Sequence, residues 1–245
     1  MRPPKLVALL SLVAPSSCWP KIKDQVSLQW SICEANPHTV LTKLGAVGRN
    51  PDKLDPITYY DTSPPVYTHQ GLMFRTKVRG GREISVVKIQ PAVPKSHMRH
   101  HAKVCRWDRY GDETTFVCKR QDPLKISHLW TTRQRELAED FQSDITWEKL
   151  VGYGPYPNPK WKTLRVEGYR AVLDDVAVQS LHLLELEVKV HRAEEDRAYQ
   201  VITEYLSAQG VVLCTRQEPK TMRLFRAMGF VTTQDESQDV YTHDL

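Results

Sequence analysis

The sequence predicts an α+β protein built on a mostly antiparallel sheet. Eight or nine segments have strand-like patterns, and the helical segments are grouped between and after them instead of following every strand. No G-x-G-x-x-G or G-x-x-x-x-G-K-[ST] motif is present, which counts against a nucleotide-binding α/β fold. A chain of 245 residues can bury a sizeable core. Strands of similar pattern lie on both sides of the proline-rich segment 153–159, so we expect a single domain over residues 20–245.

Residues 1–19 resemble a short secretory signal. Arg2 and Lys5 precede the apolar run LVALLSLVA at residues 6–14. Leu12 and Pro15 are atypical of the cleavage site that would follow Ala14, so the alternative is a leader that packs on the domain. Secreted and cytoplasmic locations both stay open. No apolar run approaches the ~20 residues of a membrane-spanning helix, so we expect no membrane span.

The first half of the chain is expected to hold six strands and one short helix. Residues 25–33 (QVSLQWSIC) alternate with period two, which is typical of a strand. Asn36 is a suitable N-cap for a helix over 38–47, with Pro37 at its first position. The turn signals RGGR and YGD separate strand-like segments. The remaining predicted strands are 57–60, 72–78, 84–89, 102–107 and 114–119.

The second half is expected to end in helices. Residues 130–150 have a mixed, partly helical pattern, and 153–159 (YGPYPNP) predict a loop. Residues 163–169, 171–178 and 183–190 predict three further strands. Residues 194–208 place apolar side chains on one helical face and stop at Gly210, and a last helix is expected over 220–228.

The five cysteines are an odd number and include no C-x-x-C motif or zinc-binding spacing. Cys105 and Cys118 lie on two segments that we expect to be neighbouring strands. They would form a disulfide if the chain is secreted. Buried thiols are the favoured interpretation.

The net charge of +5 is too small to indicate a nucleic-acid partner, so the placement of charge matters more than its total. Arg75, Lys77 and Arg79 are spaced by two and project from one face of a strand. Glu185, Glu187 and Lys189 do the same on a later strand, whose other face is apolar. Lys88 and Arg165 add cations on two further strands.

Charges of both signs on several strands suggest a sheet curled into a barrel with a polar interior. Such an interior must be neutralised, because isolated buried charges are costly. A small anionic molecule, with or without a divalent cation, would neutralise it. Arginine matches phosphate or carboxylate with two hydrogen bonds, and glutamate oxygens bind Mg²⁺ or Mn²⁺.

Several short motifs together resemble the CYTH domain, or triphosphate tunnel, family. Their order along residues 25–230 is that of the family, and the helix from Glu194 also falls where the family has one. The motifs are YDT at 60–62, GLMFRTK at 71–77, GGREISVVK at 80–88, LDDV at 173–176 after Arg165, and LELE at 184–187.

This resemblance implies an eight-stranded antiparallel tunnel with flanking helices that binds triphosphates or other phosphorylated molecules, with Mg²⁺ or Mn²⁺ as cofactor. Matched residue by residue, it makes Arg75, Lys77, Lys88 and Arg165 phosphate binders. It makes Glu185 and Glu187 the metal ligands and the catalytic pair. Thiamine triphosphatase, inorganic triphosphatases and class IV adenylate cyclases are members of the family.

One departure from the family is serious. The E-x-E-x-K motif expected on the first strand is replaced by Ser27, Gln29 and Ser31. A metal site would lose half of its ligands, which also suits a neutral or carboxylate-bearing organic ligand. Trp30, Phe74 and Trp107 would then line the tunnel, unless they belong to the core.

Other clusters are weaker candidates. His97, His100 and His101 are more typical of an exposed loop than of a metal or anion site. Asp174 and Asp175 are adjacent on a strand, so at most one of them enters the tunnel. Asp61 is expected to shape a turn.

Three functions are therefore carried forward. The first is a metal-dependent phosphohydrolase that clamps phosphate with the four cations. The second is a repurposed tunnel that binds a small organic metabolite and promotes a cyclisation or isomerisation without metal, and the third is a non-catalytic ligand-binding protein. The sequence does not indicate an oligomeric state.

Overall fold

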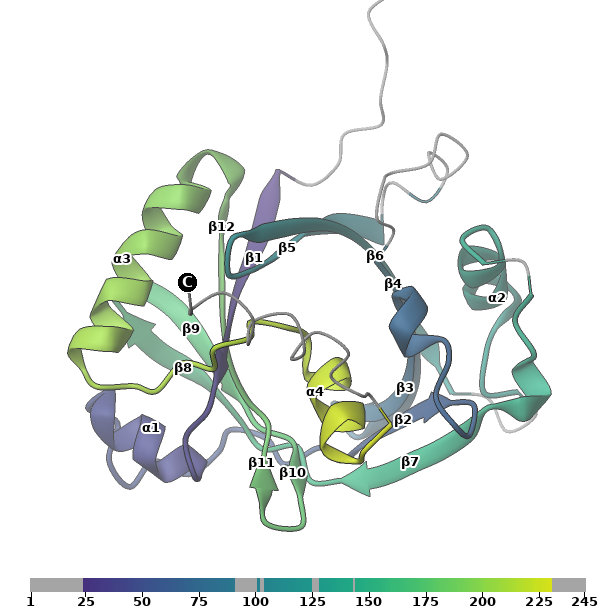
Figure 1. Ribbon diagram of the computed structural model, residues 1–245, viewed down its shortest axis with the longest axis horizontal. Coiled ribbons are helices and arrows are strands. Elements are labelled where there is room, and N and C mark those ends of the chain that lie inside the picture. Colours follow the sequence, from purple (N-terminus) through teal and green to yellow (C-terminus); the bar gives the residue numbers. More distant parts are fainter. Residues whose placement is uncertain (1–23, 91–100, 102–103, 125–127, 143, 231–245) are drawn as a thin grey trace, which may run out of the picture.

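A strongly curled sheet of ten strands is the main feature of the structure (Figure 1). The predicted α+β class with a mostly antiparallel sheet is confirmed. The structure, a computed structural model, describes residues 24–90, 101, 104–124, 128–142 and 144–230. The strand number differs from the expected eight. The expectations for residues 1–19, His97 and His100 lie outside the described residues.

The elements follow the predicted order closely. The strands of the curled sheet are β1 (Gln25–Ile32), β2 (Ile57–Asp61), β3 (Leu72–Arg79), β4 (Arg82–Ile89), β5 (Cys105–Tyr110), β6 (Glu113–Pro123), β7 (Val151–Tyr156), β8 (Lys160–Val166), β9 (Tyr169–Asp174) and β12 (Leu184–His191). A separate hairpin pairs β10 (Ala177–Val178) with β11 (Leu181–His182). The α-helices are α1 (Pro37–Lys43), α2 (Thr132–Glu139), α3 (Glu195–Ala208) and α4 (Lys220–Ala227).

The strand order in the sheet is β7-β2-β3-β4-β6-β5-β1-β12-β9-β8, so β7 and β8 are its edges. Neighbouring strands pair antiparallel with one exception, the parallel pair of β1 and β5. This pairing joins the N-terminal strand to the middle of the chain. It thereby brings β5 and β12 to opposite sides of β1.

The predicted loop at residues 153–159 was wrong in part, because its first half belongs to β7. Pro155 lacks a backbone N–H, so it cannot stand in a central strand of a sheet. An edge strand has one unpaired side, and β7 is such an edge. Because β7 is an edge strand, the missing N–H of Pro155 does not interrupt the hydrogen bonding of the sheet.

Apolar side chains on the convex face of the sheet form the core. Trp30 is fully buried, stacks on Tyr199 of α3 at 4.9 Å between ring centroids, and donates a hydrogen bond of 2.8 Å to Thr203. Phe74 packs with Trp147 in a second cluster beneath α2. Trp30 and Phe74 therefore belong to the core. A third apolar cluster, which includes Ile57 and Tyr59 of β2 with Leu224 and Phe225 of α4, lies within the curl of the sheet beside the polar groups.

Two disulfides cross-link the described chain, so the interpretation of buried thiols was wrong. Cys105 and Cys118 occupy opposite positions on β5 and β6, and Cys33 after β1 is bonded to Cys214. Beside the second bond, Gln217 accepts from the Ser31 backbone N–H at 2.8 Å and donates to its carbonyl at 3.0 Å. The segment that leads into α4 is therefore tied to β1, and α4 lies within the curl of the sheet (Figure 1).

Two local expectations are confirmed. The Asn36 side chain accepts from the Thr39 N–H and caps α1. Asp61 accepts from the backbone N–H groups of Val66, Tyr67 and Thr68 and shapes the turn after β2. Among the described residues, no helix is long and apolar enough to cross a membrane.

Candidate functional site: a charged cavity

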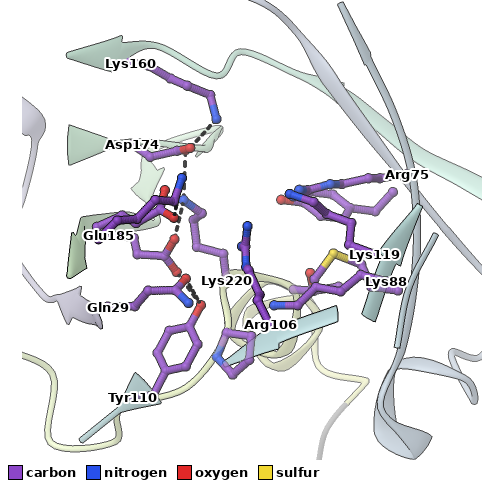
Figure 2. Close-up of a pocket in the computed structure, with 16 residues that line it drawn as sticks. Gln29, Arg75, Lys88, Arg106, Tyr110, Lys119, Lys160, Asp174, Glu185 and Lys220 are labelled. Atoms are coloured by element: carbon purple, nitrogen blue, oxygen red, sulfur yellow. Dashed lines mark hydrogen bonds and ion pairs between the residues drawn. The ribbon is translucent and has the colours of Figure 1, made fainter. Parts of the chain in front are cut away.

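A cavity lies on the concave face of the sheet, where charged side chains from many strands converge (Figure 2). Its lining includes seven cations and three carboxylates. The residues are Gln29, Tyr59, Met73, Arg75, Lys88, Arg106, Tyr110, Lys119, Lys160, Asp174, Glu185, Glu187, Lys189, Pro219, Lys220 and Thr221. Figure 2 shows Arg75, Lys88 and Lys119 facing Asp174 and Glu185 across the cavity.

One side of the cavity, which we name the cationic wall, is formed by the neighbouring strands β3, β4, β6 and β5. It comprises Arg75, Lys88, Arg106 and Lys119, together with Lys77 two residues beyond Arg75 on β3. Side chains two residues apart share one face of a strand. The register places Lys88 opposite Lys119, so the pleat turns both side chains to the same face.

Two members of the cationic wall share a buried counter-charge. Lys88 Nζ lies 2.8 Å from Asp108 Oδ2, and Arg106 Nε lies 2.9 Å from Asp108 Oδ1. Burial alone would raise the pKa of Asp108, but the two cations lower it to about 2. Asp108 is therefore ionised and neutralises one of these two charges.

The other three cations, Arg75, Lys77 and Lys119, have no carboxylate partner among the described residues. The buried Nε of Arg75 has no hydrogen-bond acceptor there either. Burial, followed by repulsion from Arg106 and Arg75, lowers the pKa of Lys119 to about 6. Burial and the charge of Arg75 lower the pKa of Lys77 to about 7. The described part of the chain thus supplies no carboxylate partner for Arg75, and none for Lys77 or Lys119 when these lysines are protonated.

The opposite side, which we name the acidic wall, consists of Asp174 on β9 with Glu185 and Glu187 on β12. Each of these carboxylates has a cation of the protein beside it. Lys160 binds Asp174, and Lys220 lies 2.8 Å from Asp174 and 3.1 Å from Glu185. Lys189 lies 3.3 Å from Glu187. Burial opposes the ionisation of Asp174, but the pKa falls well below its ordinary value because Lys160 and Lys220 outweigh it.

The first strand supplies neutral side chains where the family motif has charged ones. The Ser27 hydroxyl donates to Glu187 at 2.5 Å, and Gln29 Oε1 lies 2.5 Å from the Tyr110 hydroxyl oxygen. Ser31 Oγ donates to the Glu218 carbonyl at 2.9 Å and so binds the segment before α4. Ser27 and Ser31 therefore form local hydrogen bonds, and none of the three side chains adds charge to the acidic wall.

This donor set does not fit a divalent metal. The described residues contain no group of three or more His, Cys, Asp or Glu side chains arranged to hold an ion. A Mg²⁺ or Mn²⁺ site needs carboxylate oxygens that are not already neutralised, and every carboxylate of the acidic wall has an ammonium partner. The expectation that Glu185 and Glu187 coordinate a metal therefore conflicts with the arrangement of the side chains.

Arg165 lies apart from the other predicted site residues. It is exposed at the end of β8, and its guanidinium donates to the Gly168 carbonyl at 3.1 Å. It is absent from the cavity lining, whereas Arg75, Lys88, Glu185 and Glu187 all line the cavity and Lys77 lies beside Arg75. The expectation about Asp174 and Asp175 is confirmed, because Asp174 lines the cavity while Asp175 binds His182 at 2.7 Å.

Sequence reasoning missed four cations of the cavity: Arg106, Lys119, Lys160 and Lys220. For Arg106 the sequence did hold a signal, because this residue lies in the predicted strand 102–107 and an acidic residue, Asp108, follows two positions later. Lys119 is followed by Arg120, so the charges do not alternate there. Lys220 begins a helix, and its approach to Asp174 depends on contacts distant in sequence.

Solved structures with a similar fold share little sequence identity with this chain. A proposed adenylyl cyclase from Hippeastrum, HpAC1, described as having a dominant triphosphatase activity, is 14% identical with a TM-score of 0.54; the match covers 84% of this chain and 97% of that one. A proposed adenylate cyclase from Bacillus halodurans is 14% identical with a TM-score of 0.55, covering 82% and 99%.

No protein-family model and no curated protein matches the chain. The likeness is therefore one of architecture: a curled, mostly antiparallel sheet with flanking helices. The chain has the CYTH, or triphosphate tunnel, fold.

Proposed function

We propose that the cavity binds a small polyanion, with a phosphate-bearing molecule as the best-fitting class. The observation that carries this proposal is the set Arg75, Lys77 and Lys119, basic side chains without a carboxylate partner among the described residues, beside a wall whose carboxylates are all paired. Buried charges without partners are destabilising. A ligand that brings several negative charges supplies the missing counter-charge.

The chemistry of the cationic wall suits phosphate. The Arg75 guanidinium offers several N–H donors in one plane, which match two phosphate oxygens, and the lysines add compact donors. Arg75 on β3 and Lys119 on β6 line the cavity, and Lys77 lies two residues beyond Arg75 on β3. A ligand with charges spread over several atoms contacts more of these basic groups than a single carboxylate does. This favours an oligophosphate over a monocarboxylate.

Three functions are considered for such a site: hydrolysis of a phosphate bond, metal-independent conversion of an organic anion, and binding without catalysis. Among the similar structures, HpAC1 is described with a triphosphatase activity. Hydrolysis of a triphosphate is therefore the first reaction to assay. A protein that binds tripolyphosphate without releasing phosphate belongs to one of the other two classes.

The test is thermal and urea unfolding of the protein with inorganic tripolyphosphate, in buffer freed of metal by dialysis. A ligand at a hundredfold excess over its Kd stabilises the native state by about 2.7 kcal/mol. We expect stabilisation of the wild type and its loss in Arg75→Ala. Arg82→Ala is the matched control, because Arg82 is an exposed arginine on the adjoining strand of the same hairpin. Equal stabilisation of both variants would place the anion elsewhere.

A further inference from the structure

Asp174 and Glu185 present two carboxylates side by side on the concave face of the sheet. They are register partners on β9 and β12, so their side chains emerge together from the same face. Two neighbouring carboxylates resist ionising together unless a cation lies between them. Such a pair would hold a divalent metal if its oxygens had no other partner.

Lys220 lies between these two carboxylates. Its Nζ is 2.8 Å from Asp174 Oδ1 and 3.1 Å from Glu185 Oε1. The remaining oxygens are also engaged: Lys160 binds Asp174 Oδ2, and Tyr110 donates to Glu185 Oε2 at 2.9 Å. Each of the four carboxylate oxygens therefore has an ammonium or hydroxyl group of the protein within 3.1 Å.

The position of Lys220 is fixed by the fold. It is the first residue of α4, and its side chain is 9% exposed. The chain just before it is held to β1 by the Cys33–Cys214 disulfide and by Gln217, which bonds both backbone groups of Ser31. These contacts hold the ammonium in the cavity without help from a ligand.

We propose that Lys220 is a built-in cation that takes the place of a divalent metal on the acidic wall, so that the cavity binds its polyanion in metal-free form. This inference rests on the proposed function. It accounts for the neutral Ser27 and Gln29 on β1: a wall neutralised by lysine has no need of further carboxylates. It also narrows the ligand class to free polyanions, as distinct from their magnesium complexes.

The first experiment measures the binding of Mn²⁺ alone, without any anion, by electron paramagnetic resonance. We expect no saturable site in the wild type and a gain in Mn²⁺ affinity of at least about tenfold in Lys220→Gln, which frees two carboxylates. The matched control is Arg226→Gln, which removes one charge from the same helix and breaks the ion pair with Glu218 at 3.0 Å. A saturable Mn²⁺ site in the wild type, or equal affinities in the folded variants, overturns the inference.

The second experiment needs only the wild type and so does not depend on the folding of a variant. Tripolyphosphate is titrated by calorimetry in metal-free buffer and again with Mg²⁺. We expect binding in both, with an affinity no higher when Mg²⁺ is present. Binding that requires Mg²⁺ overturns the inference but leaves the proposed function standing. Absence of binding in both conditions overturns the proposed function, while the Mn²⁺ titrations still test Lys220.

Discussion

The two walls of the cavity contain similar residue types but compensate their charges differently. On the acidic wall, Asp174, Glu185 and Glu187 each lie within 3.3 Å of a lysine. On the cationic wall, Asp108 serves Lys88 and Arg106, while Arg75, Lys77 and Lys119 have no acidic partner in the described part of the chain. A wall that compensates its own charges is stable without a ligand. A wall that does not is stabilised by binding one.

The largest expected change in stability comes from removing a carboxylate that neutralises lysines on the acidic wall. Asp174→Ala leaves Lys160 and Lys220 without their shared partner in a buried site. Removing one member of a buried ion pair costs about 3–5 kcal/mol, because the remaining charge stays desolvated. The free energy of unfolding in urea measures this loss.

Asp196→Ala is the control for that measurement. Asp196 pairs with Arg109 at 2.7 Å, but its side chain is 97% exposed. Exposed pairs contribute about 0–1 kcal/mol. Similar losses in the two variants would mean that the acidic wall is not compensated as described.

On the cationic wall, removing a charge is expected to raise the free energy of unfolding, in contrast to the loss expected for Asp174→Ala. Lys119→Met keeps most of the side-chain volume and removes a buried amino group that has no carboxylate partner in the described part of the chain. We therefore expect the free energy of unfolding of the unliganded protein to rise by on the order of 1–3 kcal/mol. The same variant should bind tripolyphosphate at least about tenfold more weakly. Urea unfolding with and without the anion measures both effects, and a destabilised variant would contradict the comparison of the walls.

The gain in stability should depend on pH. The pKa of Lys119 is about 6 in the folded state against 10.5 as the ordinary value. The unfolded chain therefore binds one more proton between these values, and wild-type stability rises with pH across that window. The advantage of Lys119→Met should be largest below pH 6 and shrink as the pH rises toward 10.5.

Anion affinity should rise as the pH falls, because protonation gives Lys77 and Lys119 a positive charge. At pH 8, Lys119 and Lys77, with pKa values of about 6 and about 7, are mostly neutral, so an anion must bind together with protons. We expect affinity to rise by about tenfold or more from pH 8 to pH 6. Sulfate, whose charge is constant over this range, is the probe for calorimetry. A flat profile in the wild type, or an unchanged slope in Lys119→Met, would count against the assignment.

The smallest effect is expected at Arg165, outside both walls. Its exposed guanidinium bonds only the Gly168 carbonyl among the described residues. Arg165→Gln should therefore change tripolyphosphate affinity by less than about twofold, against at least about tenfold for Arg75→Gln. A large loss in Arg165→Gln would restore the role that the family resemblance implied for it.

Local patterns predicted the parts of the fold that depend on neighbouring residues. The alternation in β12 placed Glu185 and Glu187 on one face and the apolar stripe on the other, as the structure has them. Spacing by two likewise placed Arg75 and Lys77 together on β3.

What the sequence could not predict depends on long-range contacts. The Cys33–Cys214 bond joins residues 181 positions apart, and Lys220 reaches Asp174 only after α4 enters the curl of the sheet. Arg165 is paired with Arg170, four residues along β9 from the cavity residue Asp174, so it lies farther along the sheet than its motif implies. It also stands just before the tight turn at Glu167 and Gly168, where the backbone adopts positive φ. Where a paired strand ends relative to the cavity is set by tertiary structure, so a short motif does not determine it.

The Cys33–Cys214 bond also changes the topology of the molecule. It converts most of the chain into a covalent ring that contains β2 to β12, α1 to α3 and nearly all of the charged cavity lining. A ring of this size reduces the entropy of the unfolded chain by an amount worth about 5 kcal/mol. A single backbone cut anywhere inside the ring leaves one covalent molecule, so a nicked protein separates into fragments only after reduction.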